Sequence, residues 1–97
     1  MSDNTASTYI TFHNQASHSF FLLEKDFIAS AGKLNRQKEE FRFQQLKSDY
    51  VNKLKYRLEE CAQELMSRNH LAGSTGQNFN DFIKDYLFRF VQKINSY

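Results

Sequence analysis

Proline and tryptophan are absent from this 97-residue chain, which also contains only three glycines and one cysteine. Without proline, little in the sequence forces a helix to stop, so long helices with short connections are expected. A single cysteine excludes an internal disulfide bond and is typical of a reducing compartment, such as the cytoplasm or the nucleus. We therefore expect an intracellular protein.

Segments for membrane insertion or export are also missing. No stretch approaches the roughly 18 consecutive apolar residues that a membrane span needs. Residues 1–14 lack the basic start and apolar run of a secretory signal peptide. We expect no membrane partner.

The longest helical pattern covers residues 36–68, which contain no glycine and many Leu, Glu, Lys, Gln and Arg residues. Its apolar side chains follow one another at intervals of three or four residues: Phe43, Leu46, Tyr50, Leu54, Leu58, Cys61 and Leu65. An interval of eleven separates Phe43, Leu54 and Leu65, which is typical of a nearly straight helix. The sequence predicts one long central helix, about 50 Å in length.

A second helix is predicted over residues 79–95. Its apolar residues keep the 3.6-residue period for four turns: Phe79, Phe82, Ile83, Tyr86, Leu87, Phe90, Val91 and Ile94. The glycine-containing segment 71–77 is predicted to be a loop, with Asn78 as the helix cap. Phe88 falls outside the apolar stripe, so it is either a contact for a partner or an ordinary exposed aromatic residue.

The N-terminal part allows two interpretations. Residues 1–8 are polar and small and are expected to be flexible. A helix over about 17–31 would place Phe20, Leu23 and Phe27 on one side. Alternatively, the alternation in residues 9–13 suggests a short β-strand or a hairpin within residues 8–23. We favour the helix because the apolar spacing continues to Phe27 and Ile28.

These elements predict an all-α protein. We expect one helical domain over residues 9–97, a bundle or hairpin built on the helix at 36–68. The short helix at 17–31 would be separated from it by a turn near Gly32.

Residues that could carry chemistry are scattered. Cys61 lies on the apolar stripe beside Glu59 and Glu60, which would raise the pKa of its thiol, so a core position is expected. The histidines at 13, 18 and 70 have no metal-binding spacing. We predict no catalytic residue, no cofactor and no metal.

The main functional prediction is a non-enzymatic protein-interaction module, either a homo-oligomer or a subunit or adaptor of a larger assembly. A 33-residue helix is longer than the predicted flanking helices can cover, so part of its stripe would seek another chain. The candidate interface consists of Phe43, Leu46, Tyr50, Leu54, Leu58, Leu65 and Phe88.

The alternative is a helical nucleic-acid-binding protein. The net charge of +2 is small, but the basic residues Lys33, Arg36, Lys38 and Arg42 gather at the start of the long helix. Glu39 and Glu40 interrupt this group and weaken its field. Salt discriminates between the two functions, because phosphate binding weakens between 50 and 200 mM salt and apolar contacts do not.

Overall fold

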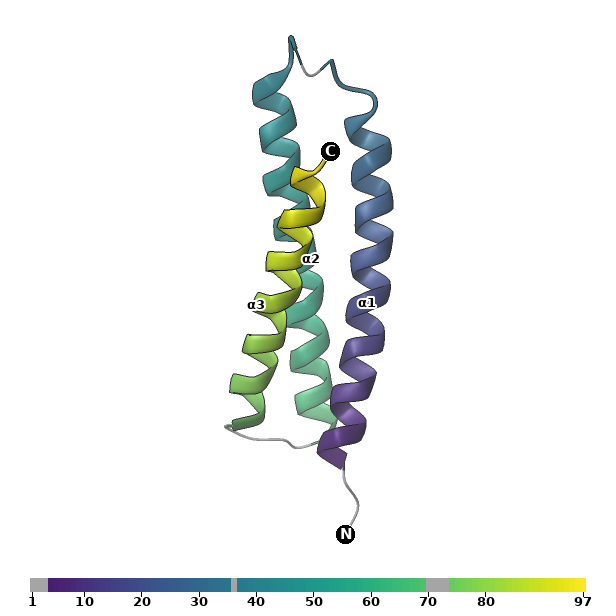
Figure 1. Ribbon diagram of the computed structural model, residues 1–97. Helices are drawn as coiled ribbons and strands as arrows, with labels where there is room; N and C mark the ends of the chain where they lie inside the picture. Colours follow the sequence, from purple (N-terminus) through teal and green to yellow (C-terminus); the bar gives the residue numbers. More distant parts are fainter. Residues whose placement is uncertain (1–3, 36, 70–73) are drawn as a thin grey trace.

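Three helices form an elongated bundle with extents of 59 × 19 × 18 Å (Figure 1). The computed structural model describes residues 4–35, 37–69 and 74–97, and side chains at 6–35, 37–68 and 77–97. The described residues contain no strand, and the helices are α1 (Asn4–Ala31), α2 (Glu40–Asn69) and α3 (Ser74–Asn95). The predicted all-α class is confirmed.

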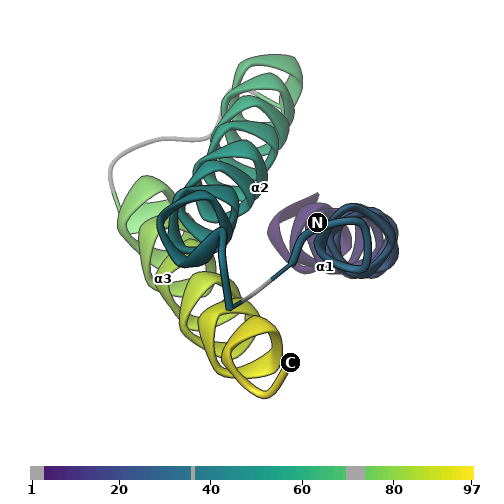
Figure 2. The ribbon, with the colours of Figure 1, turned by 90° about the horizontal axis from the view of Figure 1, so that it is seen from above.

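The helices lie side by side at the corners of a triangle (Figure 2). α1 and α3 run in the same direction, and α2 runs opposite to both (Figure 1). In the part of the chain that the structure describes, no helix has the length and apolarity that crossing a membrane requires.

α1 is almost twice as long as the helix predicted over 17–31, and the strand or hairpin within residues 8–23 is wrong. Thr8, Phe12 and Ala16 are spaced by four and are all buried, so they form one helical face. A five-residue alternation is too short to compete with that continuous face. Asn4–Thr8, expected to be flexible, belong to the first turns of α1, and residues 1–3 lie outside the described residues.

The turn between α1 and α2 is organised by Asn35. Its side-chain oxygen accepts hydrogen bonds from the backbone amides of Gln37 (3.1 Å) and Lys38 (3.4 Å). The carbonyl of Glu39 then accepts a bond from the amide of Phe43 at 2.9 Å. α2 therefore begins at Glu40, four residues later than the predicted start at position 36.

α3 begins at Ser74, inside the segment predicted to be a loop. Asn78 is therefore not a cap. It lies within α3, and its amide nitrogen donates to the Tyr9 hydroxyl at 2.8 Å. A single glycine costs a helix only about 1 kcal/mol, so Gly76 does not end it. Residues 70–73 lie outside the described residues.

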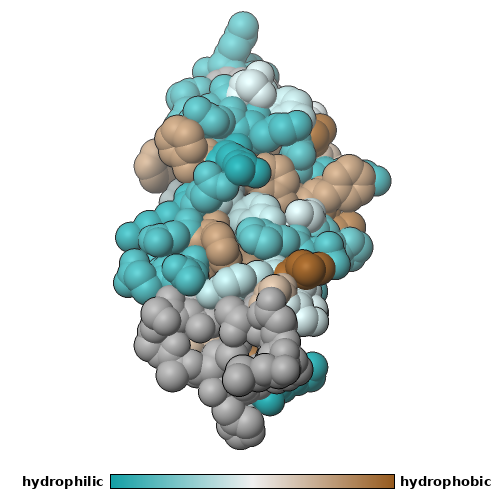
Figure 3. Space-filling model, turned by 60° about the horizontal axis from the view of Figure 1, so that its bottom comes forward, coloured by the Kyte–Doolittle hydropathy of each residue, from teal (hydrophilic) through white to brown (hydrophobic). Residues whose placement is uncertain are grey.

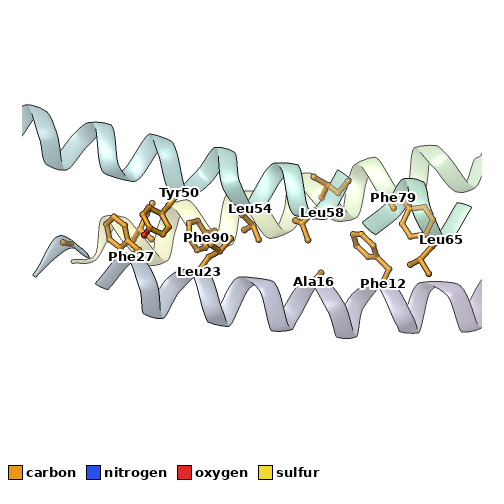
Figure 4. Close-up of a cluster of buried hydrophobic side chains, with 14 of the residues drawn as sticks. Phe12, Ala16, Leu23, Phe27, Tyr50, Leu54, Leu58, Leu65, Phe79 and Phe90 are labelled. Atoms are coloured by element: carbon orange, nitrogen blue, oxygen red, sulfur yellow. The ribbon is translucent and has the colours of Figure 1, made fainter. Parts of the chain in front are cut away.

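The core runs along the whole bundle axis (Figure 4). The largest fully buried side chains come from all three helices: Phe12, Phe27, Leu54, Leu58, Phe79, Phe90 and Ile94. At one end Tyr9 and Phe12 of α1 contact Phe79 edge-on, with ring centroids 5.4 and 4.9 Å apart. The many phenylalanines thus serve mainly to fill the space between the helices.

Polar pairs connect α1 to both neighbours. The Tyr50 hydroxyl of α2 donates to Asp26 at 2.8 Å and lies 3.2 Å from the Ser30 hydroxyl. Burial, and then the nearby Asp26, raises the pKa of Tyr50, although the Ser30 hydrogen bond acts in the opposite direction. On the other side of α1, His13 Nδ1 lies 2.9 Å from the Tyr86 hydroxyl of α3. These pairs fix the rotation of α1 about its own axis.

Replacing the ring of Phe90 tests the core. Phe90 is 0% exposed and Phe88, two residues away on the same helix, is 63% exposed. We expect Phe90→Ala to lower the free energy of unfolding by about 3–5 kcal/mol, because it leaves a cavity in the core. The matched variant Phe88→Ala should change it by less than about 0.5 kcal/mol. Urea denaturation followed by circular dichroism measures both, and equal effects would contradict the assigned packing.

Candidate interaction surface

Most of the predicted interface lies inside the bundle. Phe43, Tyr50, Leu54, Leu58 and Leu65 are buried, and Leu46 is half-buried. The expectation of an uncovered stripe assumed short flanking helices. With 28 residues in α1 and 22 in α3, the 30 residues of α2 are covered within one chain. A partner cannot reach the five buried side chains unless the bundle opens.

Phe88 is the one predicted interface residue on the surface. It lies on the outer side of α3, where its neighbours one turn away include Lys84, Asp85 and Gln92. Single exposed apolar residues between polar ones are common in proteins. On the face drawn in Figure 3, apolar residues likewise form separate patches among hydrophilic ones. Phe88 alone does not make an interface.

The outer side of α1 differs from that of α3, because α1 carries large apolar residues on more than one of its sides. Phe20, Phe21, Leu22 and Leu23 are consecutive, and a rotation of 100° per residue cannot direct all four toward the core. Leu23 is buried and Phe20 half-buried, whereas Phe21 is 55% exposed. An apolar helix surface on the side away from the core is typical of a helix with a further neighbour.

Phe21 belongs to a regular line of residues along the helix, which we call the outer seam of α1. The seam residues follow one another at intervals of four, three, four, three and four: Ile10, Asn14, Ser17, Phe21, Glu24 and Ile28. This spacing keeps all of them on one side of a helix. Ile10 is 62% and Ile28 39% exposed. Sequence reasoning missed the seam because the favoured helix over about 17–31 left Ile10 outside it, and the alternative placed Ile10 in a strand or hairpin. Ile10, Phe21 and Ile28 nevertheless share a helical face.

A cleft of about 190 Å³ adjoins the seam between α1 and α3. It is lined by Ser17, Phe20, Tyr86 and Arg89. The Phe20 ring packs edge-on against the buried Phe90 ring, with centroids 5.3 Å apart. Arg89 is held by an ion pair with Asp85 at 2.8 Å. The floor of the cleft is therefore aromatic and fixed by the core.

The seam is nearly free of charge. Residues 4–23 contain no Asp, Glu, Lys or Arg. Glu24 is the only ionisable carboxylate on the seam, and it accepts a hydrogen bond from the Tyr97 hydroxyl at 3.1 Å and lies 3.6 Å from the Lys93 ammonium. The neighbouring Lys25 ammonium lies 5.2 Å above the Phe21 ring. The seam therefore favours an apolar partner over a strongly charged one.

The basic residues predicted to contact nucleic acid lie around the turn between α1 and α2. Lys33 and Lys38 are exposed in this connection, and Arg42 is exposed in the first turn of α2. Arg36 lies outside the described residues. Arg42 lies 3.7 Å from the Glu39 carboxylate and shares a shallow cleft with Asp49. Carboxylates are thus interleaved with the cations in space as well as in the sequence.

Cys61 lines a larger cleft, of about 470 Å³, between α1 and α2. Its thiol donates to the Gln15 side-chain oxygen at 2.7 Å. Burial and then the charge of Glu64 raise the pKa of this thiol, so it is a weak nucleophile at neutral pH. His18 lines the same cleft. Among the described residues, no three His, Cys, Asp or Glu side chains come together as a metal site.

No family model matches this chain, and no curated protein or solved structure matches it. Its function is therefore inferred from the surface of the molecule.

The environment of Cys61 predicts slow alkylation. In the folded protein, iodoacetamide should modify Cys61 more slowly at pH 7.5 than in the urea-unfolded chain, because less thiolate is present. The rate in the folded protein should continue to rise with pH after the rate in the unfolded chain has levelled off, because the folded thiol has the higher pKa. Glu64→Gln removes the nearby negative charge and should speed the reaction, whereas Glu59→Gln serves as the control. Rapid modification of the folded protein at neutral pH would contradict this account.

Proposed function

We propose that this protein is a non-enzymatic, intracellular interaction module, a small subunit or adaptor that binds a protein partner through the outer seam of α1. The observation that carries the proposal is the line of Ile10, Phe21 and Ile28. These three large apolar side chains are exposed along a helix whose other side already supplies the core.

The energetics of burial support this role. Full burial of an Ile or Phe side chain stabilises by about 1.5–3 kcal/mol relative to full exposure. Three partly exposed side chains on one line therefore offer several kcal/mol to a partner, from which the cost of association must be subtracted. Such a surface suits a reversible complex.

The cleft at Cys61 does not favour catalysis by its thiol. The thiol of Cys61 is held protonated, and its pKa is raised rather than lowered. A nucleophilic cysteine needs the opposite shift, from a nearby cation or a helix N-terminus. The chemistry of this cleft therefore lends no support to a thiol enzyme.

A photo-reactive residue at the seam tests the proposal. We expect p-benzoylphenylalanine in place of Phe21 to give a discrete cross-linked product in cells that express the protein. The same residue in place of Phe88 is the matched control, because both positions are exposed phenylalanines in helix interiors. No product at position 21, or equal products at both positions, would contradict the proposal.

Nucleic-acid binding is the second candidate, since Lys33, Lys38 and Arg42 are exposed at one end of the bundle. The neighbouring Glu39 and Asp49 lead us to expect no tight binding. Fluorescence anisotropy with labelled single- and double-stranded oligonucleotides at 50 and 200 mM salt measures this. If binding weakens about tenfold or more over this range and is lost in Lys38→Gln/Arg42→Gln, the nucleic-acid function is favoured instead.

A further inference from the structure

The outer seam of α1 is complementary to itself. We propose that its partner is a second copy of this chain, docked antiparallel about a two-fold axis, with Phe21 of each copy in the cleft at Ser17 of the other. This inference rests on the proposed function of the seam and adds the identity of the partner.

The spacing of the seam is the first support. Its intervals of four, three, four, three and four read the same in both directions. In two antiparallel helices related by a two-fold axis, each residue lies opposite a residue of the second copy. The two residue numbers of every such pair add up to the same total. A sum of 38 pairs Ile10 with Ile28 of the second copy, Asn14 with Glu24, and Ser17 with Phe21. Every seam residue then has a partner, as in the interlocking of two coiled helices.

The sizes of the paired side chains also match. The exposed Phe21 ring lies opposite the small Ser17, which lines the cleft with Phe20, Tyr86 and Arg89. The cleft measures about 190 Å³. An apolar protein cavity of about 150 Å³ is known to hold a benzene ring. The cleft is therefore large enough for the phenyl ring of a second copy, which would rest on aromatic side chains.

The paired side chains favour the antiparallel arrangement over the parallel one. Antiparallel pairing places Glu24, whose carboxylate is already held by Tyr97 and Lys93 of its own chain, opposite the uncharged Asn14. A parallel, in-register pair would instead bring Glu24 against Glu24 and Phe21 against Phe21. That arrangement places two carboxylates and two large rings against one another and leaves both clefts at Ser17 empty. The two-fold arrangement also closes on itself, so it gives a dimer and not a filament.

Solution mass is the first test. Sedimentation equilibrium of the full chain should show reversible association to twice the chain mass of 11.5 kDa. Phe21→Ser removes the inserted ring and Ser17→Lys blocks the cleft, and each should raise the dimer dissociation constant by about tenfold or more. Phe88→Ser should leave it unchanged. Circular dichroism of each variant verifies that the bundle is still folded.

Disulfide formation tests the direction of the two helices. Chains carrying Ile10→Cys and Ile28→Cys, both with Cys61→Ser, are oxidised separately and as a mixture. We expect the mixture to give a disulfide between the two different chains, and each variant alone to give little. In the antiparallel dimer, position 10 of one copy lies about 27 Å along the helix from position 10 of the other. Ready disulfide formation by either variant alone would overturn the proposal.

The outcomes separate this inference from the proposed function. A chain that stays monomeric at all concentrations, yet cross-links through position 21 to a different protein, would disprove the dimer and retain the seam as a binding surface. A dimer that Phe21→Ser and Ser17→Lys do not weaken would disprove the seam as its interface. Absence of both a dimer and a cross-link at position 21 would overturn both proposals.

Discussion

The packing of α1 into the groove between α2 and α3 is the interaction on which the rest of the bundle depends. α2 and α3 are consecutive and antiparallel, but alone they would leave one side of their shared apolar surface in water. Phe12 and Phe27 of α1 fill that side, and both are fully buried. Phe12 contacts Phe79 of α3, and Phe27 contacts Tyr50 of α2 edge-on at 5.6 Å. The two phenylalanine rings of α1 therefore contact different helices.

Polar contacts on two sides of α1 add specificity to this packing. His13 reaches Tyr86 of α3, while Gln15 and Asp26 reach Cys61 and Tyr50 of α2. A small rotation of a helix changes the energy of its apolar contacts only a little, whereas hydrogen bonds are directional and are weakened by it. Because α1 is held from both directions, its third side must face outward. The outer seam is thus exposed because these contacts hold the other sides of α1 against α2 and α3.

This arrangement changes which helix is expected to meet a partner. The apolar stripe of α2 is narrow and lies inside the bundle, and its outer side is charged apart from the exposed Phe41 and Tyr56. α1 has few charges and apolar residues on more than one side, so two neighbours do not cover it. A helix of this kind is stable in a monomeric bundle and still has apolar surface to bury. The seam and the cleft at Ser17 together give that surface a defined shape.

The sequence by itself determined the helical class, because the 3.6-residue period of α2 and α3 spans several turns. The buried positions Tyr50, Leu54, Leu58 and Phe90 follow directly from that period. Tertiary structure alone decided the extent of α1, since the short alternation in residues 9–13 is compatible with a strand or a helix. It also decided that the α2 stripe is interior, because coverage depends on the lengths of the other two helices. The spacing of Phe20, Leu23 and Phe27 also placed these side chains on one side of a helix, and in the structure that side is the inner one. Only the tertiary structure decided that Phe21 is exposed, because α2 and α3 do not cover that side of α1.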